Sequence, residues 1–269
     1  MELQNKVVVI THATNVLGTA LAKALAEQGA FLLLSGNDEP ALQQLASELD
    51  PNRRTLISAD LSSDAGRVKI VDACREQDTS IDMLINNPSG NAQGSFRATA
   101  QSDISQFIDS NLTAPIVLTR ALLPQLAERK AAMIVNIGTL SASIGLPGFT
   151  VDSTARFGLR GFSEALAREL DNTSTKVIYV AHRGLAYPQE KTPAPDLHGA
   201  LKRPLDKPGV VAKTIIKAIV AESPFTQLGR AERWWIKLNA VSPKRVDRAL
   251  RKRLPIFAHF AKRKTFRQR

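Results

Sequence analysis

Residues 134–170 read IVNIGTLSASIGLPGFTVDSTARFGLRGFSEALAREL. An apolar run comes first, a segment with glycines and a proline follows, and from about Asp152 apolar residues recur at helical spacing. This order predicts a buried strand, a loop and a long helix. A strand that reads as a continuous apolar run is typical of a parallel sheet covered on both faces.

The same alternation extends along the rest of the chain. Stretches of helical period separate the short apolar runs KVVVI, FLLL, TLIS, DMLI and KVIYV. This βαβ rhythm predicts the α/β class, with a Rossmann-type doubly wound parallel sheet between two helical layers in a single domain. We assign residues 1–229 to this domain, with a mobile, proline-rich loop at about 185–208, and residues 230–269 to a basic helical extension.

Composition narrows the class of protein further. The chain has 269 residues, 43% of them hydrophobic, which is enough to bury a continuous core. Its single cysteine, Cys74, excludes an internal disulfide, and the start of the sequence does not resemble a secretory signal. No apolar run approaches the roughly 20 residues that span a bilayer. We therefore expect a cytoplasmic protein, peripheral at the inner face of the membrane at most.

The positive charge is concentrated in the extension. The formal net charge is +11, yet residues 230–269 contain 14 Lys and Arg against two carboxylates. Apolar side chains accompany these cations: Trp234, Trp235, Ile236, Leu238, Leu254, Ile256, Phe257 and Phe260. This combination predicts an amphipathic element on an anionic membrane surface. Packing of part of this apolar set on the domain is left open. An ordinary solvated extension is the first alternative, and nucleic acid ranks last because no recognition motif is present.

Four segments, taken in order, resemble the short-chain dehydrogenase/reductase family over residues 5 to about 228. They are THATNVLG after the first strand, LINNPSG after the fourth, NLTAPIVLTRALLP in the long helix, and the stretch quoted above. The resemblance implies a Rossmann fold, a nicotinamide cofactor, NADP(H) or NAD(H), and redox chemistry on a ketone or alcohol. We expect no metal.

At the first turn the family pattern T-G-x-x-x-G-x-G is only partly kept. Its glycines let the backbone approach the cofactor phosphates. The corresponding residues here are Thr11, His12, Val16 and Gly18. Two of the three glycines are replaced, so cofactor binding is predicted to be weak or lost. The imidazole either fills the vacated space or donates to an anion.

Other cofactor positions are mixed. Asn37 stands where relatives place arginine for NADP or aspartate for NAD, whereas Asp60 and Asn86 match positions that contact the cofactor in the family. Asp60 is equally suited to capping the segment that follows it.

The family's catalytic Asn, Ser, Tyr and Lys correspond here to Asn111, Thr139, Asp152 and Arg156. The tyrosine donates a proton to the carbonyl oxygen, and the lysine lowers the pKa of that phenol. An ordinary carboxyl has a pKa of about 3.9 against about 10 for tyrosine, so Asp152 holds no proton at pH 7. Four residues apart on one helix, Asp152 and Arg156 are predicted to form an ion pair.

His182 offers an alternative. With Asp152 it could form an acid–base pair, although a histidine at a strand end is more often structural. Three functions remain open: a non-catalytic or impaired subunit, an NADP(H)-dependent oxidoreductase with an altered site, and a non-redox lyase or isomerase. The helix ARFGLRGFSEALAREL is apolar on more than one side, which predicts a homodimer, a homotetramer or an assembly with an active relative.

Overall fold

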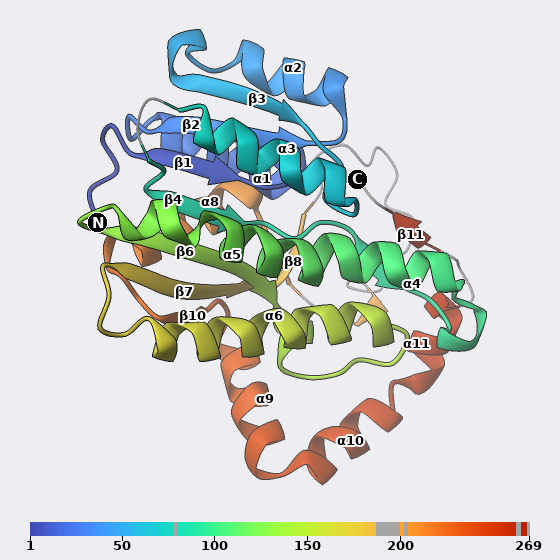
Figure 1. The fold of residues 1–269 in the computed structure, drawn as a ribbon. Coiled ribbons are helices and arrows are strands. Elements are labelled where there is room, and N and C mark those ends of the chain that lie inside the picture. The colour runs from blue at the N-terminus through green and yellow to red at the C-terminus, as the bar shows by residue number, and fades with distance from the viewer. Residues whose placement is uncertain (78–79, 187–199, 202–203, 262–264, 268–269) are drawn as a thin grey trace.

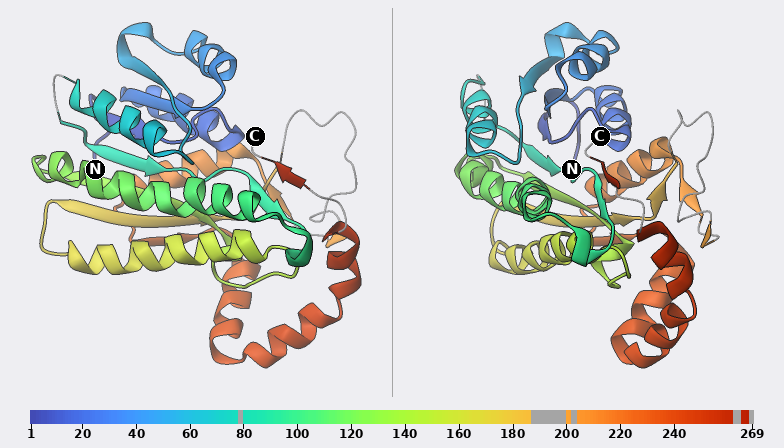
Figure 2. Two further views of the ribbon diagram at one scale, coloured as in Figure 1. Left: turned by 45° about the vertical axis from the view of Figure 1, so that its right-hand side comes forward. Right: turned by 90° about the vertical axis from the view of Figure 1, so that its right-hand side faces the viewer.

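The computed structural model of the chain describes residues 1–77, 80–186, 200–201, 204–261 and 265–267. Its centre is a seven-stranded sheet in the order β10-β7-β6-β4-β1-β2-β3, with every neighbouring pair parallel. Helices cover both faces (Figures 1 and 2). The predicted doubly wound α/β fold is therefore confirmed.

The strands of this sheet are β1 Val7–Ile10, β2 Phe31–Gly36, β3 Arg54–Ser58, β4 Met83–Asn86, β6 Ala132–Thr139, β7 Thr175–His182 and β10 Phe225–Gln227. The helices of the domain are α1 Val16–Ala26, α2 Glu39–Ser47, α3 Asp64–Arg75, α4 Gln101–Ile108, α5 Ala114–Ala127, α6 Thr150–Glu169 and α8 Pro208–Val220. Two short strand pairs lie outside the sheet: β5 Asn91–Gln93 with β11 Thr265–Arg267, and β8 Gly184–Leu185 with β9 Leu205–Asp206.

Strand β1 shows why its apolar run is continuous. Val8 and Ile10 belong to the core cluster that includes α1 and α8, while Val7 and Val9 belong to the cluster that includes α3 and α5. Successive side chains of a strand point to opposite faces, so both faces of β1 need apolar residues. The strand order reverses between β1 and β4. In sheets of this kind, that reversal opens a crevice at the carboxyl ends of the strands.

Some elements differ from the sequence prediction. Helix α6 begins at Thr150, two residues before the predicted start, and a π-helical turn at Asp109–Thr113 interrupts the long helix between α4 and α5. The edge strand β10 was not predicted, because it has only three residues, of which only Phe225 is apolar, and these leave too short an apolar run. Most of the loop predicted at about 185–208 lies outside the described residues.

The basic extension forms an arm of three helices, α9 Arg230–Val241, α10 Pro243–Arg251 and α11 Leu254–Ala261, which extends beyond the sheet (Figures 1 and 2). One cluster attaches it to the loop before α6, and the arm side chains in that cluster are Trp235, Ile236, Leu238, Val246, Leu250, Ile256 and Phe257. Their domain partners include Ile144, Leu146 and Phe149. Much of the apolar set that we expected to face a membrane therefore packs on the domain.

Three large apolar side chains of the arm remain exposed in the described part of the chain: Trp234, Val241 and Leu254, at 58%, 81% and 44%. The side chain of Phe260 lies outside the description. Among the described helices, none has the length and apolar character needed to cross a membrane.

Candidate functional site

The turn after β1 is fixed by hydrogen bonds to the end of β4. The Thr11 hydroxyl accepts from the backbone N–H of Asn87 at 2.9 Å. Asn15 caps α1 by accepting from the N–H of Gly18 at 2.7 Å. A Cβ at Gly18 would lie 2.5 Å from the carbonyl oxygen of His12, so only glycine fits there. The retained glycine thus keeps the turn close to the helix.

His12 replaces a family glycine and keeps a glycine-like backbone. Its φ is +47°, in the left-handed region that most residues avoid. The ring Nε2 lies 3.1 Å from the Ser110 hydroxyl oxygen, and Nδ1 is buried without a hydrogen-bond partner among the described residues. Burial lowers the pKa of His12 to about 4, and the charge of Arg156 acts in the same direction. The imidazole is therefore neutral at pH 7.

The remaining cofactor positions are spread over the edge of the sheet. Val16 is partly exposed at the first residue of α1, and Asn37 is exposed after β2. Asp60 is also exposed, and its carboxylate accepts from the N–H and hydroxyl of Ser62, at 2.9 and 2.8 Å. Ser63, not Asp60, is the cap of α3. The residue that caps α3 is therefore three positions after the predicted one.

Two adjacent asparagines, Asn86 at the end of β4 and Asn87 directly after it, point in different directions. Asn86 is fully buried, and its Nδ2 donates to Oδ1 of Asn136 at 2.7 Å, in the interior of the sheet. Asn87 instead donates from Nδ2 to the His12 carbonyl at 3.2 Å and to Asn15 Oδ1 at 3.1 Å. The residue that meets the first turn is therefore Asn87, which the motif alignment missed. The alternation of side chains along a strand was the available signal.

Asp152 and Arg156 form the predicted ion pair on α6. Asp152 Oδ1 lies 3.5 Å from Arg156 Nε, and both side chains are buried. Nε makes no hydrogen bond within the described chain, so the contact is one of charge. Arg156 also donates from Nη2 to the Gly90 carbonyl at 3.2 Å. This last contact ties the pair to the segment after β4.

A second interaction holds the same carboxylate. The Ser141 hydroxyl donates to Asp152 Oδ2 at 2.7 Å, and Ser141 also lies 2.7 Å from the Thr139 hydroxyl. A hydroxyl carries one proton, and Ser141 gives its proton to the carboxylate. Thr139 must therefore donate to Ser141, and its own proton is not available to a substrate carbonyl. Ser141 was missed because the family motif assigns the role to position 139.

Asn111 lies in the π-helical turn between α4 and α5. It is buried, its Nδ2 donates to the Phe107 carbonyl at 3.0 Å, and its Oδ1 has no hydrogen-bond partner among the described residues. Single π-helical turns are frequent at functional sites. Asn111, which corresponds to the family's catalytic asparagine, therefore lies in a backbone conformation that is common at functional sites.

His182 ends β7 beside Thr139 of β6. Its Nδ1 contacts the carbonyl oxygen of Arg183. The carboxylate of Asp152 is held by Ser141 and Arg156. The acid–base pair of His182 with Asp152 stays a prediction.

Tyr179 on β7 is a phenol that the sequence analysis did not single out. Its ring stacks on Phe225 with centroids 5.8 Å apart, and its hydroxyl is buried against Gly138, without a hydrogen-bond partner in the described chain. Burial raises the pKa of Tyr179 above its ordinary value. A phenol with a raised pKa is a poor proton donor, so Tyr179 does not replace the family tyrosine. The described residues contain no group of His, Cys, Asp and Glu that could hold a metal ion.

The reversed strand order and the tight turn after β1 define a Rossmann-type protein. The chain belongs to the short-chain dehydrogenase/reductase family, because residues 6–189 match the short chain dehydrogenase family.

Curated relatives include the ketoacyl reductase HetN of Nostoc sp., which is 28% identical over 264 residues, 93% of this chain and 89% of the relative. The nodulation protein G of Rhizobium meliloti is 33% identical over 67% of this chain and 73% of the relative. The 3-ketodihydrosphingosine reductase of Mus musculus is 28% identical over 82% of this chain and 70% of the relative.

Solved structures share the fold. A short-chain dehydrogenase/reductase from Burkholderia phymatum in complex with NAD superposes with a TM-score of 0.81 at 20% identity, covering 91% of this chain and 96% of that one. A short-chain dehydrogenase from Burkholderia cenocepacia in complex with NADP gives a TM-score of 0.77 at 20% identity, covering 93% and 99%.

Proposed function

We propose that this chain is a family member without hydride-transfer activity by the tyrosine mechanism, and that it acts as a structural or regulatory subunit. One observation carries the proposal: the carboxylate of Asp152 is held by Ser141 and by the Arg156 guanidinium. Ser141 holds one oxygen of this carboxylate and the guanidinium lies beside the other, and a guanidinium neither gives nor takes a proton. A carboxylate would also repel the negative charge that develops on a reduced carbonyl.

The nucleotide positions support the same proposal. The His12 ring, in contact with Ser110, lies where the family resemblance places the phosphate-binding glycine. Asn37 supplies neither the charge that meets a 2′-phosphate nor the carboxylate that binds a ribose. Because these residues lack the contacts that the family makes with its cofactor, they do not fit a tightly bound dinucleotide.

The test is a calorimetric titration of the full chain with NADPH and with NADH. We expect affinities at least about tenfold weaker than those of a family member with an intact first turn, which serves as the matched control. Binding of either nucleotide in the low-micromolar range would contradict the proposal.

A reductase with an altered site is the second candidate. The left-handed backbone at His12 and the required Gly18 keep a turn that suits glycine, and Asn111 lies in a π-helical turn of the kind frequent at functional sites. The similarity to a ketoacyl reductase also extends over 93% of this chain. Steady oxidation of NADPH with a ketone or acyl ketone, abolished by heat unfolding, would favour this candidate over the first.

For partners, we propose two surfaces. Trp234 is exposed on the cationic arm, which suits an anionic membrane surface at the inner face of the membrane. Val117 on α5 is 40% exposed, which suits packing against a second subunit, identical or an active relative. Sedimentation of the full chain, alone and with anionic vesicles, tests both proposals.

A further inference from the structure

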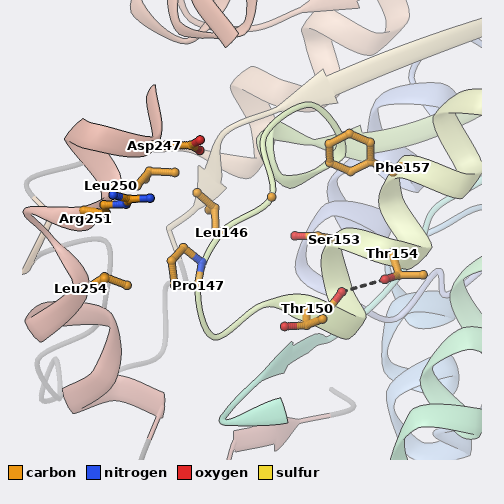
Figure 3. A pocket seen from close by; sticks show the side chains of 11 residues that line it. Leu146, Pro147, Thr150, Ser153, Thr154, Phe157, Asp247, Leu250, Arg251 and Leu254 are labelled. Carbon is orange, nitrogen blue, oxygen red and sulfur yellow. Dashed lines mark hydrogen bonds between the residues drawn. The ribbon is translucent and has the colours of Figure 1, made fainter. Parts of the chain in front are cut away.

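A groove with a volume of about 700 Å³ lies between the first turns of α6 and the arm helix α10 (Figure 3). Small-molecule sites in proteins typically have volumes of about 300–1,000 Å³. The groove lies on a different side of α6 from the ion pair, because its α6 residues are Thr150, Ser153, Thr154 and Phe157. Its size and position make it a candidate site separate from the nucleotide crevice.

Most of the groove wall is apolar. Leu146 lies between the two helices, Phe157 comes from α6, and Leu250 and Leu254 come from the arm (Figure 3). Phe157 and Leu254 are 43% and 44% exposed, so apolar surface is open to solvent within the groove. Such a wall suits the hydrocarbon part of a ligand.

One polar group points from this wall into the groove. The Ser153 side chain is directed from α6 toward Leu146 (Figure 3), and the residue is only 8% exposed. Its hydroxyl oxygen is buried and has no hydrogen-bond partner among the described residues. Buried polar groups are nearly always hydrogen-bonded, so an unpartnered hydroxyl needs an explanation. A polar atom of a bound ligand would supply the missing partner.

The charged side chains of the arm indicate whether the ligand is an anion or a cation. Arg251 lines the groove from the side opposite Ser153, and no ion pair within the described residues involves it. Asp247 also lines the groove, but residues 243–253 contain six Lys and Arg against this single carboxylate. The local field therefore favours an anion over a cation.

We propose that this groove binds an amphiphilic monoanion, a hydrocarbon chain with one carboxylate head. The chain lies against Phe157, Leu146 and Leu250, and the head receives hydrogen bonds from Arg251 and Ser153. The ligand is a free molecule held in the groove, and not a lipid headgroup in a bilayer. The proposal does not depend on whether the nucleotide crevice binds a cofactor.

The test uses the full chain and dodecanoate, titrated calorimetrically below the concentration at which the surfactant forms micelles. Dodecyltrimethylammonium and dodecanol, with the same chain and a cationic or neutral head, are the controls. We expect dodecanoate to bind at least about tenfold more tightly than either control, because the charge-assisted hydrogen bonds require the anion. Arg251→Gln should remove most of that preference.

A groove-filling variant tests the location. Gly145 lines the groove, and a Cβ added there meets no atom within 4 Å, so Gly145→Leu should fold and occupy the space. We expect it to weaken dodecanoate binding at least about tenfold. Gly209→Leu is the matched control, because Gly209 is equally open but lies on α8, outside the groove. Ser153→Ala should weaken dodecanoate binding several-fold, because it removes one hydrogen bond to the ligand.

Four results would overturn the proposal. Equal binding of the cationic and anionic surfactants would remove the role of Arg251. Unchanged dodecanoate binding in Gly145→Leu would place the ligand elsewhere, and a changed sedimentation coefficient in the same variant would identify the groove as an interface between copies. Binding to anionic vesicles without binding of monomeric dodecanoate would assign the anion to a membrane surface.

Discussion

The Nε2 atom of His12 lies 3.1 Å from the hydroxyl oxygen of Ser110, 98 residues further along the chain. This contact joins the turn after β1 to the π-helical turn that precedes α5, the helix that packs over β4 and β6. The two segments lie on the two sides of the point where the strand order reverses. Dinucleotides bind at such points in open α/β sheets. We therefore expect this side chain to compete with a cofactor for the same space, as the proposed function requires.

The buried imidazole predicts a pH dependence of stability. Its pKa is lowered to about 4 in the folded chain from 6.5, mainly by burial. Between these values the unfolded chain binds a proton that the folded chain excludes, so stability falls as pH decreases from about 6.5 to about 4 and rises again with pH. The loss amounts to at most about 3.4 kcal/mol. Urea unfolding at several pH values, compared with His12→Asn, measures it.

Asparagine is a suitable control because it tolerates a left-handed backbone and does not titrate in this range. The difference in unfolding free energy between the original chain and His12→Asn should change across the window and be constant above pH 7. A difference that does not vary with pH would show that the imidazole is solvated.

The buried ion pair predicts strong coupling between its members. Asp152→Asn leaves the Arg156 guanidinium buried without a counter-charge, which should cost about 3–5 kcal/mol of unfolding free energy. Arg156→Met should cost a comparable amount, and the double variant should cost less than the sum by at least about 1 kcal/mol. Chemical denaturation of the four proteins completes the cycle. Strictly additive losses would mean that the pair contributes through packing alone.

The sequence predicted the sheet because its central strands are continuous apolar runs, as in VVVI at Val7–Ile10. The motif spacing likewise located Asp152 and Arg156, since an i,i+4 pair depends only on local helix geometry. The contact of His12 with Ser110 could not be predicted in this way, because it depends on how two distant segments pack. The packing of Trp235 on the domain could not be predicted for a similar reason. An amphipathic pattern shows that one face of a helix is apolar, but it does not show what covers that face.

The two adjacent tryptophans of the arm predict opposite effects. Trp234 is 58% exposed, whereas Trp235 packs in the cluster with Ile144 and Leu146. Trp234→Ala should weaken salt-sensitive binding to anionic vesicles and leave stability unchanged, because the exposed ring anchors at the interface. Trp235→Ala should instead cost about 1–3 kcal/mol of unfolding free energy. Vesicle co-sedimentation at low and high salt, together with thermal unfolding, separates them.

If Trp235→Ala weakened vesicle binding and Trp234→Ala lowered stability, the membrane-facing and domain-facing sides of α9 would be the opposite of those assigned. Deletion of residues 231–269 should abolish vesicle binding if the remaining domain stays folded. A full chain that shifts duplex DNA but does not co-sediment with vesicles would identify nucleic acid as the polyanion.

Restoring the family residues on α6 is predicted to be insufficient for reductase activity. Asp152→Tyr with Arg156→Lys supplies the phenol and the ammonium, and it frees the proton of Ser141, which no longer binds a carboxylate. The His12 ring still spans the crevice, and Asn37 still supplies no cofactor contact, so NADPH should bind weakly and a generic ketone should not be reduced. Adding His12→Gly, which suits the left-handed backbone, should raise NADPH affinity at least about tenfold. Calorimetry and NADPH oxidation measure the two steps separately. If the double variant already reduced the ketone at ordinary family rates, the nucleotide site would have been competent despite His12, and only the residues on α6 would have prevented catalysis.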